Sequence, residues 1–125
     1  MRQYIFDYSR NHYPAAPIID VRLRSPYRVS EVLQAFVDSG ADCTIVPLTV
    51  LQSINANYAD KSYITGTTGV RQSVGLYEIQ IQVGNDIIYG IDAAAYGEET
   101  ILGRDVLNQI TILLDGPMAV CEITI

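Results

Sequence analysis

The chain has 125 residues, of which 49% are hydrophobic and 18% charged, and this composition predicts one globular domain over residues 1–125. Its formal net charge of −6 argues against nucleic acid or an anionic membrane as a partner, because phosphate groups bind to basic surfaces. Two cysteines, Cys43 and Cys121, are too few for a disulfide framework. Since the sequence has no signal-peptide pattern and no apolar run of membrane-spanning length, we expect a cytoplasmic protein.

Short strands separated by turn residues dominate the first half of the chain. The segment 18–23 alternates apolar and charged residues in its later part, and Ser25-Pro26 ends it. Residues 66–69, with glycine at both ends, have the composition of a hairpin turn. One or two helical turns fit residues 48–54. The strands predicted for this half are 4–8, 18–23, 32–37, 63–65 and 70–74.

The second half contains the clearest strand signal. Residues 76–83 alternate strictly between apolar and polar side chains, and a glycine-containing turn leads from them into a strand at 87–91. A short helix is predicted at 104–109. The segments 111–114 and 118–125 form a closing hairpin. Many short strands with one short C-terminal helix predict an all-β fold, a small closed or partly closed β-barrel.

The apolar segment 32–37 ends at Asp38-Ser39-Gly40. A carboxylate at the end of a buried strand costs several kcal/mol unless it is hydrogen-bonded, paired or neutralised. The glycine permits a tight turn and the close approach of another chain segment. Turns favour all three residue types, so the tripeptide alone is a weak signal. The apolar strand before it makes the signal more specific.

A second motif, Ile101-Leu102-Gly103-Arg104-Asp105, follows some sixty residues later. Alone, it is an ordinary strand that leads into a helix. Its position in the chain, after the alternating strand and before the predicted helix, makes this ordinary interpretation weaker. Together the two motifs resemble the active-site turn and the hydrophobic-hydrophobic-glycine element of the retropepsins, the small single-domain aspartic proteases.

The resemblance extends position by position from Asp38 to Asp42, with Ser39 in place of the commoner threonine. It implies a closed β-barrel of the retropepsin type with Asp38, Ser39 and Gly40 as the catalytic turn. Backbone groups near Ala41 and Asp42 are implied to hold the substrate.

The resemblance also implies supporting roles for the second motif. Its apolar pair, Ile101 and Leu102, is expected beside the catalytic turn, and Gly103 is expected to permit close packing under that turn. Arg104 and Asp105 are expected to support the site from behind. Arg104 is further expected to form an ion pair with the aspartate at position 42.

The glycine-rich segment Gly66-Thr67-Thr68-Gly69 resembles the flap, a hairpin that closes over bound substrate. Glycine suits a moving tip because it permits unusual backbone dihedrals. The two threonines are more polar than a typical flap tip. By composition alone, the segment would be a surface hairpin.

The chain contains half of an aspartic-protease site. It has one Asp-Ser-Gly, and Asp115-Gly116-Pro117 lacks the hydroxyl residue. In this class two carboxylates share a proton and activate a water, so the resemblance implies a homodimer with an Asp38 from each chain. The implied substrate is an extended polypeptide with apolar side chains near the scissile bond, and no cofactor or metal is required. The chain ends, 3–6 and 121–125, are expected in an intersubunit sheet.

Two alternatives to proteolysis remain from the residues alone. The same barrel could serve as a catalytically silent dimerisation or peptide-binding module, and the polar tip at 66–69 favours this slightly. A small-ligand β-barrel does not explain why both motifs occur together. His12, the sole histidine, has no nucleophile motif to serve and is expected in a solvated loop.

Overall fold

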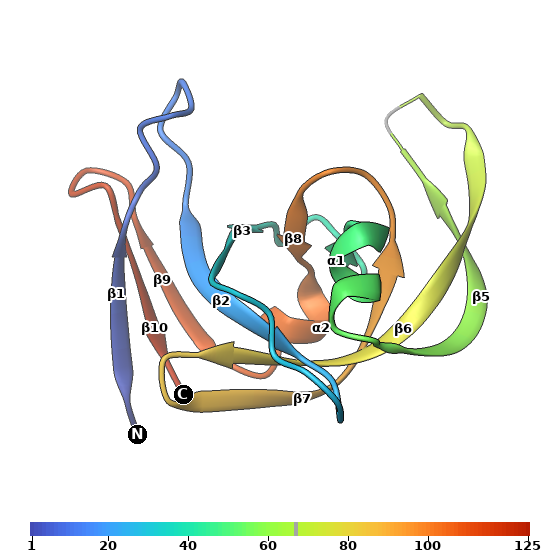
Figure 1. The fold of residues 1–125 in the computed structure, drawn as a ribbon. Coiled ribbons are helices and arrows are strands. Elements are labelled where there is room, and N and C mark those ends of the chain that lie inside the picture. The colour runs from blue at the N-terminus through green and yellow to red at the C-terminus, as the bar shows by residue number, and fades with distance from the viewer. Residues whose placement is uncertain (67) are drawn as a thin grey trace.

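The computed structural model describes residues 1–66 and 68–125. Within these residues the chain forms ten strands and two short helices (Figure 1). The strands are β1 (Gln3–Asp7), β2 (Ile18–Arg24), β3 (Leu33–Val37), β4 (Ile45–Val46), β5 (Asn57–Thr65), β6 (Arg71–Val83), β7 (Asp86–Ala95), β8 (Thr100–Leu102), β9 (Thr111–Asp115) and β10 (Val120–Thr124). The helices are α1 (Leu48–Ser53) and α2 (Arg104–Leu107).

Six strands close into a barrel. Their order is β2-β3-β8-β4-β7-β6, and an antiparallel pairing between β2 and β6 joins the two ends. Strand β8 lies between β3 and β4, parallel to β3 and antiparallel to β4. The predicted all-β fold with a closed barrel is confirmed, as is the short helix near the C-terminus.

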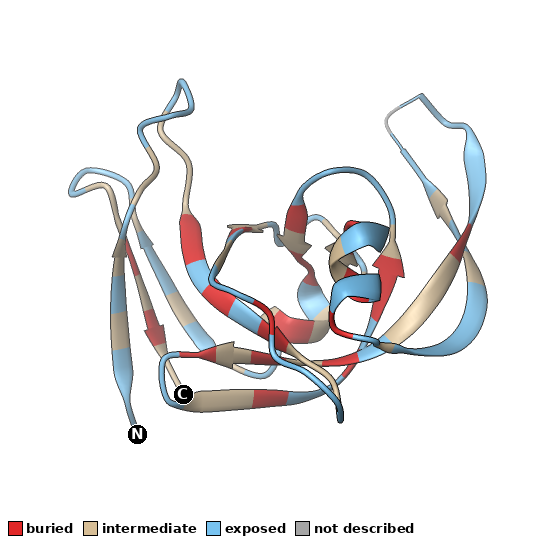
Figure 2. Ribbon diagram, viewed as in Figure 1, coloured by how far each residue is buried: buried red, intermediate tan, exposed pale blue. Residues whose placement is uncertain are grey.

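The core follows the predicted alternation of side chains. On β2, Ile19, Val21 and Leu23 are buried while Asp20 and Arg22 face solvent. On β6 the same alternation buries the apolar side chains of its C-terminal half inside the barrel (Figure 2). The helix α1 follows Pro47 and contributes a fully buried leucine to this core. The one or two helical turns predicted there are therefore a six-residue helix.

The hairpin of β5 and β6 is longer than the sequence predicted. The segments predicted at 63–65 and 70–74 are the ends of two long strands that pair from Asn57↔Glu78 to Thr65↔Arg71. Residues 57–62 are mostly exposed and contain four strongly polar side chains, so they have no apolar alternation. They are extended because β6 supplies their backbone hydrogen bonds. No helix among the described residues is long and apolar enough to cross a membrane.

The two chain ends pair with each other. In a second sheet of order β1-β10-β9, Gln3 lies opposite Thr124 and Asp7 lies opposite Val120. The segments expected in an intersubunit sheet therefore already form a sheet within one chain. This sheet retains the outer edges of β1 and β9 for any further pairing.

Tyr4 attaches this sheet to the barrel. Its hydroxyl donates a hydrogen bond of 2.5 Å to the Asp86 carboxylate and accepts one of 3.2 Å from the Asn85 N–H. Its ring lies against Gly84, where a Cβ would be 2.1 Å from the ring carbon Cε1. Since Gly84 also has φ +57°, the β6–β7 turn needs glycine for two separate reasons.

Replacing this glycine tests the attachment. Gly90 has a similar φ of +71° but open space where a Cβ would lie, so Gly90→Ala measures the backbone strain alone. We expect Gly90→Ala to lower the free energy of unfolding by about 1–2 kcal/mol. Gly84→Ala should lower it by more, because Tyr4 must also move, and urea unfolding of both variants measures the difference. Equal losses would show that the Tyr4 contact contributes nothing.

Candidate active site

The backbone after β3 forms a compact turn around the Asp38 carboxylate. The Gly40 N–H donates a hydrogen bond of 2.9 Å to Oδ1 of Asp38, and the Ala41 N–H donates one of 3.2 Å to the Asp38 carbonyl. A Cβ on Gly40 would lie 3.1 Å from the same Oδ1. A larger residue at position 40 would therefore crowd the carboxylate that the turn holds in place.

Strand β8 brings the second motif to this turn. Its parallel pairing with β3 places Val37 opposite Leu102, and the Asp38 N–H donates a hydrogen bond of 3.1 Å to the Leu102 carbonyl. Ile101 lies opposite Phe36 on one side and opposite Ile45 on the other. Both residues of the apolar pair thus belong to the strand that contacts the turn.

Gly103 packs directly under the turn. A Cβ there would lie 2.5 Å from both the carbonyl carbon and the carbonyl oxygen of Cys43, and 3.0 Å from the Ala41 carbonyl oxygen. Backbone atoms cannot move aside as the end of a side chain can, so this position excludes every residue except glycine. The next residue continues the contact, because the Arg104 N–H donates a hydrogen bond of 2.9 Å to the Ala41 carbonyl.

A buried threonine joins the two motifs from inside. Thr44 is 0% exposed, and its hydroxyl donates a hydrogen bond of 2.8 Å to Oδ1 of Asp105. The same hydroxyl accepts one of 3.2 Å from the Gly103 N–H, and the Thr44 N–H donates one of 3.1 Å to Oδ2 of Asp105. Asp105 also accepts a hydrogen bond from the N–H of Val106 at the start of α2. Its carboxylate therefore accepts hydrogen bonds from two backbone N–H groups and from the Thr44 hydroxyl.

Arg104 joins the two motifs from outside. Its guanidinium forms an ion pair with Asp42 and donates a hydrogen bond of 3.1 Å to the Ser39 carbonyl. The predicted pair of Asp42 and Arg104 is thus present. In a single chain it is exposed, with 46% of the Arg104 side chain and 89% of the Asp42 side chain accessible to solvent. An exposed pair of this kind contributes little to the stability of one chain.

The exposure of the turn at Asp38 differs from the expectation. Asp38, Ser39 and Gly40 are all exposed, whereas the sequence suggested a carboxylate buried at the end of a strand. The strand before them enters the barrel, with Ala35 fully buried, but the turn itself lies beyond the end of the barrel. No described residue of the same chain covers it. The desolvation cost inferred from the sequence is therefore absent in one chain.

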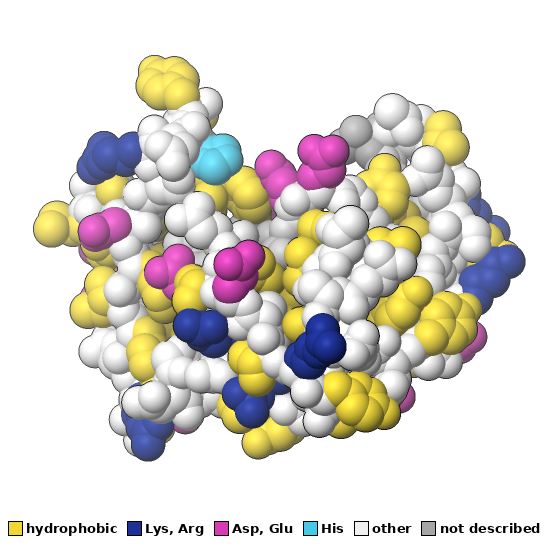
Figure 3. Space-filling model, viewed as in Figure 1, with side chains coloured by type: hydrophobic (Ala, Val, Ile, Leu, Met, Phe, Trp, Pro, Cys, Tyr) yellow, Lys and Arg dark blue, Asp and Glu magenta, His cyan; other side chains and the backbone are white. Residues whose placement is uncertain are grey.

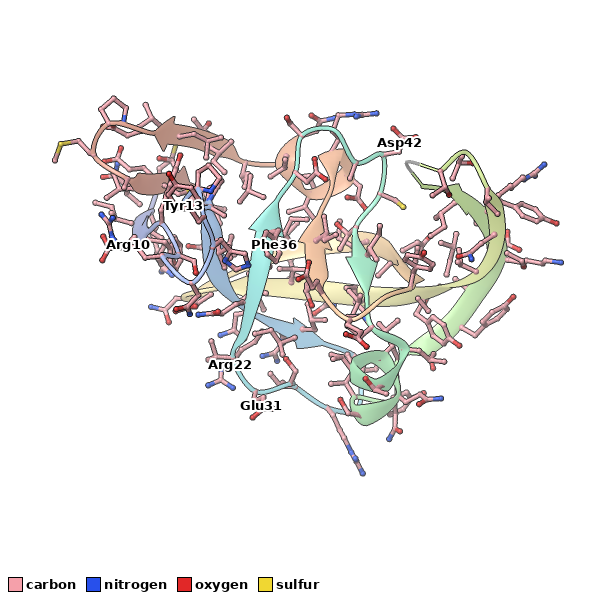
Figure 4. All side chains as sticks on the ribbon, turned by 90° about the horizontal axis from the view of Figure 1, so that it is seen from above. Arg10, Tyr13, Arg22, Glu31, Phe36 and Asp42 are labelled. Carbon is pink, nitrogen blue, oxygen red and sulfur yellow. The ribbon has the colours of Figure 1, made fainter. Side chains whose placement is uncertain are left out.

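The glycine-rich tip joins β5 to β6. The Gly69 N–H donates a hydrogen bond of 3.0 Å to the Gly66 carbonyl, and Gly69 has φ +76°. Thr68 is exposed, and Thr67 lies outside the described residues. Seen from above, the end of this hairpin and Asp42 lie along the same edge of the molecule (Figure 4). No hydrogen bond joins the described residues of the tip to the Asp38 turn.

Cys43 follows the turn but is poorly suited to nucleophilic chemistry. Burial raises the pKa of its thiol, and the negative charges of Asp105 and Asp42 raise it further. Burial alone raises the pKa of Cys121 to about 11. Both thiols are free. Among the described residues, no group of three or more His, Cys, Asp or Glu side chains is arranged to hold a metal ion.

Sequence reasoning missed two contributors near the turn. Thr44 gave no signal in the sequence because threonine is common before an apolar pair. Its burial is what indicates a partner, since a buried hydroxyl almost always forms a hydrogen bond. His12 was expected in a solvated loop and is exposed, but its ring also packs edge-on against Phe36 at 5.0 Å between centroids. That contact joins residues far apart in the chain, so no local pattern could reveal it.

The Thr44 network generates a test with a matched control. Thr44→Val keeps the shape but removes the hydroxyl that donates to Asp105 and accepts from the Gly103 N–H, so we expect a loss of about 1–3 kcal/mol in the free energy of unfolding. Thr100 is also buried, but its hydroxyl makes no hydrogen bond to another described residue. Thr100→Val should therefore cost much less in the same urea titration. Similar small losses for both variants would show that the hydrogen bonds of the Thr44 hydroxyl do not stabilise the fold.

No protein-family model and no curated protein sequence matches this chain. Solved structures do match. A retropepsin-like aspartic protease from Rickettsia conorii superposes with a TM-score of 0.69 at 12% identity, over 98% of this chain and 90% of that one. The EIAV protease complexed with the inhibitor HBY-793 gives 0.57 at 21% identity, over 75% and 86% of the two chains. The Simian Foamy Virus (mac) protease gives 0.53 at 17% identity, over 73% and 91%. This chain has the retropepsin-like fold.

Proposed function

We propose that the protein is an aspartic endopeptidase that acts as a homodimer and hydrolyses peptide bonds with a water activated by two copies of Asp38. The observation that carries this proposal is the meeting of the two motifs. The Asp38 turn is exposed, hydrogen-bonded to Leu102 and packed on Gly103, within a retropepsin-like fold. The two motifs that resemble those of the retropepsins therefore contact each other within a retropepsin-like fold.

A second copy is needed because one chain offers one suitable carboxylate. Asp115 is the last residue of β9, and its Oδ1 accepts a hydrogen bond of 3.0 Å from the Met118 N–H in the turn that follows. Asp105 and Asp42 are occupied by Thr44 and Arg104. Asp38 alone combines exposure with a hydroxyl and a glycine after it. A two-fold axis beside the turn would bring two such carboxylates together.

The chemistry follows from that pairing. Two carboxylates in contact do not both ionise, so the pair holds one proton. The ionised member takes a proton from a water, the water attacks the scissile carbonyl carbon, and the protonated member donates to the carbonyl oxygen. The reaction needs no cofactor and no covalent intermediate. Ser39, through its hydroxyl, would hold the two turns in register across the axis.

One edge of the molecule suits this dimer. Seen from above, the β9–β10 hairpin, the catalytic turn and the end of the β5–β6 hairpin follow one another along that edge (Figure 4). Leu113, Leu114 and Met118, on or beside the β9–β10 hairpin, are at least half exposed. Exposed apolar side chains beside an exposed catalytic turn are what a subunit contact requires.

The substrate in this proposal is an extended polypeptide. It would lie between the catalytic turn and the tip of the β5–β6 hairpin, and its backbone would be held by Gly40, Asp42 and residues 66–69. We also propose that the protein works in the cytoplasm, where the thiols of Cys43 and Cys121 would stay reduced.

Asp38→Asn tests the chemistry. Asparagine keeps the shape of the turn but can neither take a proton from water nor share one, so peptide hydrolysis should fall to background. The free energy of unfolding and the dimer dissociation constant should stay close to wild type. Asp60→Asn is the matched control, because Asp60 is an exposed aspartate of β5, and it should keep full activity.

Two outcomes would contradict the proposal. Wild-type turnover by Asp38→Asn would exclude the dyad. A wild-type dimer that binds peptides but cleaves none, from a broad peptide mixture at acidic and neutral pH, would favour the catalytically silent peptide-binding module.

Arg104→Ala tests the dimer. The pair with Asp42 is exposed in one chain but would be partly buried if a second chain packed against the turn, and stranding a buried charge is costly. We expect the dimer dissociation constant to rise roughly tenfold, measured by sedimentation at several concentrations. Arg10→Ala removes an exposed arginine near the N-terminus and should leave the dissociation constant unchanged. An unchanged dissociation constant for Arg104→Ala would place the subunit contact elsewhere.

A further inference from the structure

The loop between β7 and β8, residues 96–99, carries two neighbouring carboxylates at the end of β8 opposite the catalytic turn. Glu98 and Glu99 are exposed and directly precede Thr100, the first residue of β8. Strand β8 is the strand whose last carbonyl holds the Asp38 N–H. The two glutamates and the catalytic aspartate thus stand at the two ends of one three-residue strand.

Two hollows flank this loop, and both glutamates line both of them. On the β3 side, a hollow of about 290 Å³ has Leu33 and Phe36 among its apolar walls. On the β4 side, a hollow of about 350 Å³ has Ile45 and Ile101. Phe36 lies two residues before Asp38, and Ile101 lies two residues before Gly103. Figure 3 shows acidic side chains gathered at the depression between the two raised ends of the molecule.

The carboxylates of Glu98 and Glu99 are not used by the fold. Neither forms a hydrogen bond or an ion pair with another described residue, in contrast to Asp105 and Asp42, which both have partners. A hollow with apolar walls and a free carboxylate at its rim fits a side chain with an apolar stem and a cationic end. Lysine and arginine have that structure.

We propose that Glu98 and Glu99 select substrates with a lysine or arginine close to the scissile bond. This inference rests on the proposed endopeptidase function and names the class of peptide that it acts on. An extended peptide over the catalytic turn directs successive side chains to opposite sides, so its side chains reach the hollows beside β8. The apolar walls accept the stem of a basic residue, and the glutamates distinguish it from a neutral one of the same length.

The experiment compares peptides that differ only in charge. A peptide found by cleavage of a mixture is resynthesised with lysine or with norleucine at each position near the cut, because norleucine keeps the stem and lacks the ammonium group. We expect lysine to raise kcat/KM by about tenfold at one or more positions, and added salt to reduce this preference. The double variant Glu98→Gln, Glu99→Gln should cleave the norleucine peptide normally and lose the preference for lysine.

Glu31→Gln is the control for overall charge. Glu31 is exposed and lies near the start of β3, at the opposite end from the catalytic turn, and it lines neither hollow (Figure 4). It should keep the preference for lysine. A preference that survives in the double variant, or that falls equally in Glu31→Gln, would overturn the inference.

A separate measurement distinguishes this inference from the proposed function. Binding of the lysine and norleucine peptides to Asp38→Asn needs no catalysis. If no peptide is cleaved by the wild type, the proposed function fails, and tighter binding of the lysine peptide that depends on Glu98 and Glu99 would still support selection. If the wild type cleaves both peptides equally and Asp38→Asn binds both equally, the selection is refuted while the proteolytic function stands.

Discussion

The whole site depends on one close approach of backbone to backbone. Gly103 lies so near the carbonyl of Cys43 that any side chain would displace it. The same approach lets Leu102 accept the Asp38 N–H and lets Ala41 accept the Arg104 N–H. Because β8 is inserted between β3 and β4, this contact fixes the turn from below while its upper side stays open. The Asp38 turn is therefore both held by backbone hydrogen bonds and exposed.

The acidic side chains around this contact divide into two groups by their partners. Asp105 and Asp42 are held by Thr44 and Arg104, and they stabilise the positions of backbone segments. One carboxylate oxygen of Asp38 accepts a hydrogen bond from the Gly40 N–H, and the residue is exposed. Glu98 and Glu99 have no partner among the described residues. Three exposed carboxylates therefore have no part in joining the two motifs, and among them we assign the chemistry to Asp38 and the selection of substrates to Glu98 and Glu99.

The sequence predicted the parts of this site that are local. Asp38-Ser39-Gly40 and Ile101-Leu102-Gly103 are contiguous, and strict alternation revealed the long strand β6. Strand β4 was not predicted as a separate element, since two residues contain no period, and β8 was indicated only by the motif at its end. The exposure of Asp38 and the contact of His12 with Phe36 depend on where the barrel ends, which only the folded chain determines. For the same reason, the pairing of the two chain ends within one chain could not be read from either end.

The central claim is that one active site needs Asp38 from two chains, and subunit mixing tests it most directly. Wild-type and Asp38→Asn chains are equilibrated at a fixed total concentration well above the dimer dissociation constant, and peptide hydrolysis is measured as their ratio changes. If hybrid dimers are inactive, activity follows the square of the wild-type fraction, so an equal mixture retains about a quarter of it. Activity that falls in direct proportion, to about a half, would mean that each chain acts alone and would contradict the account.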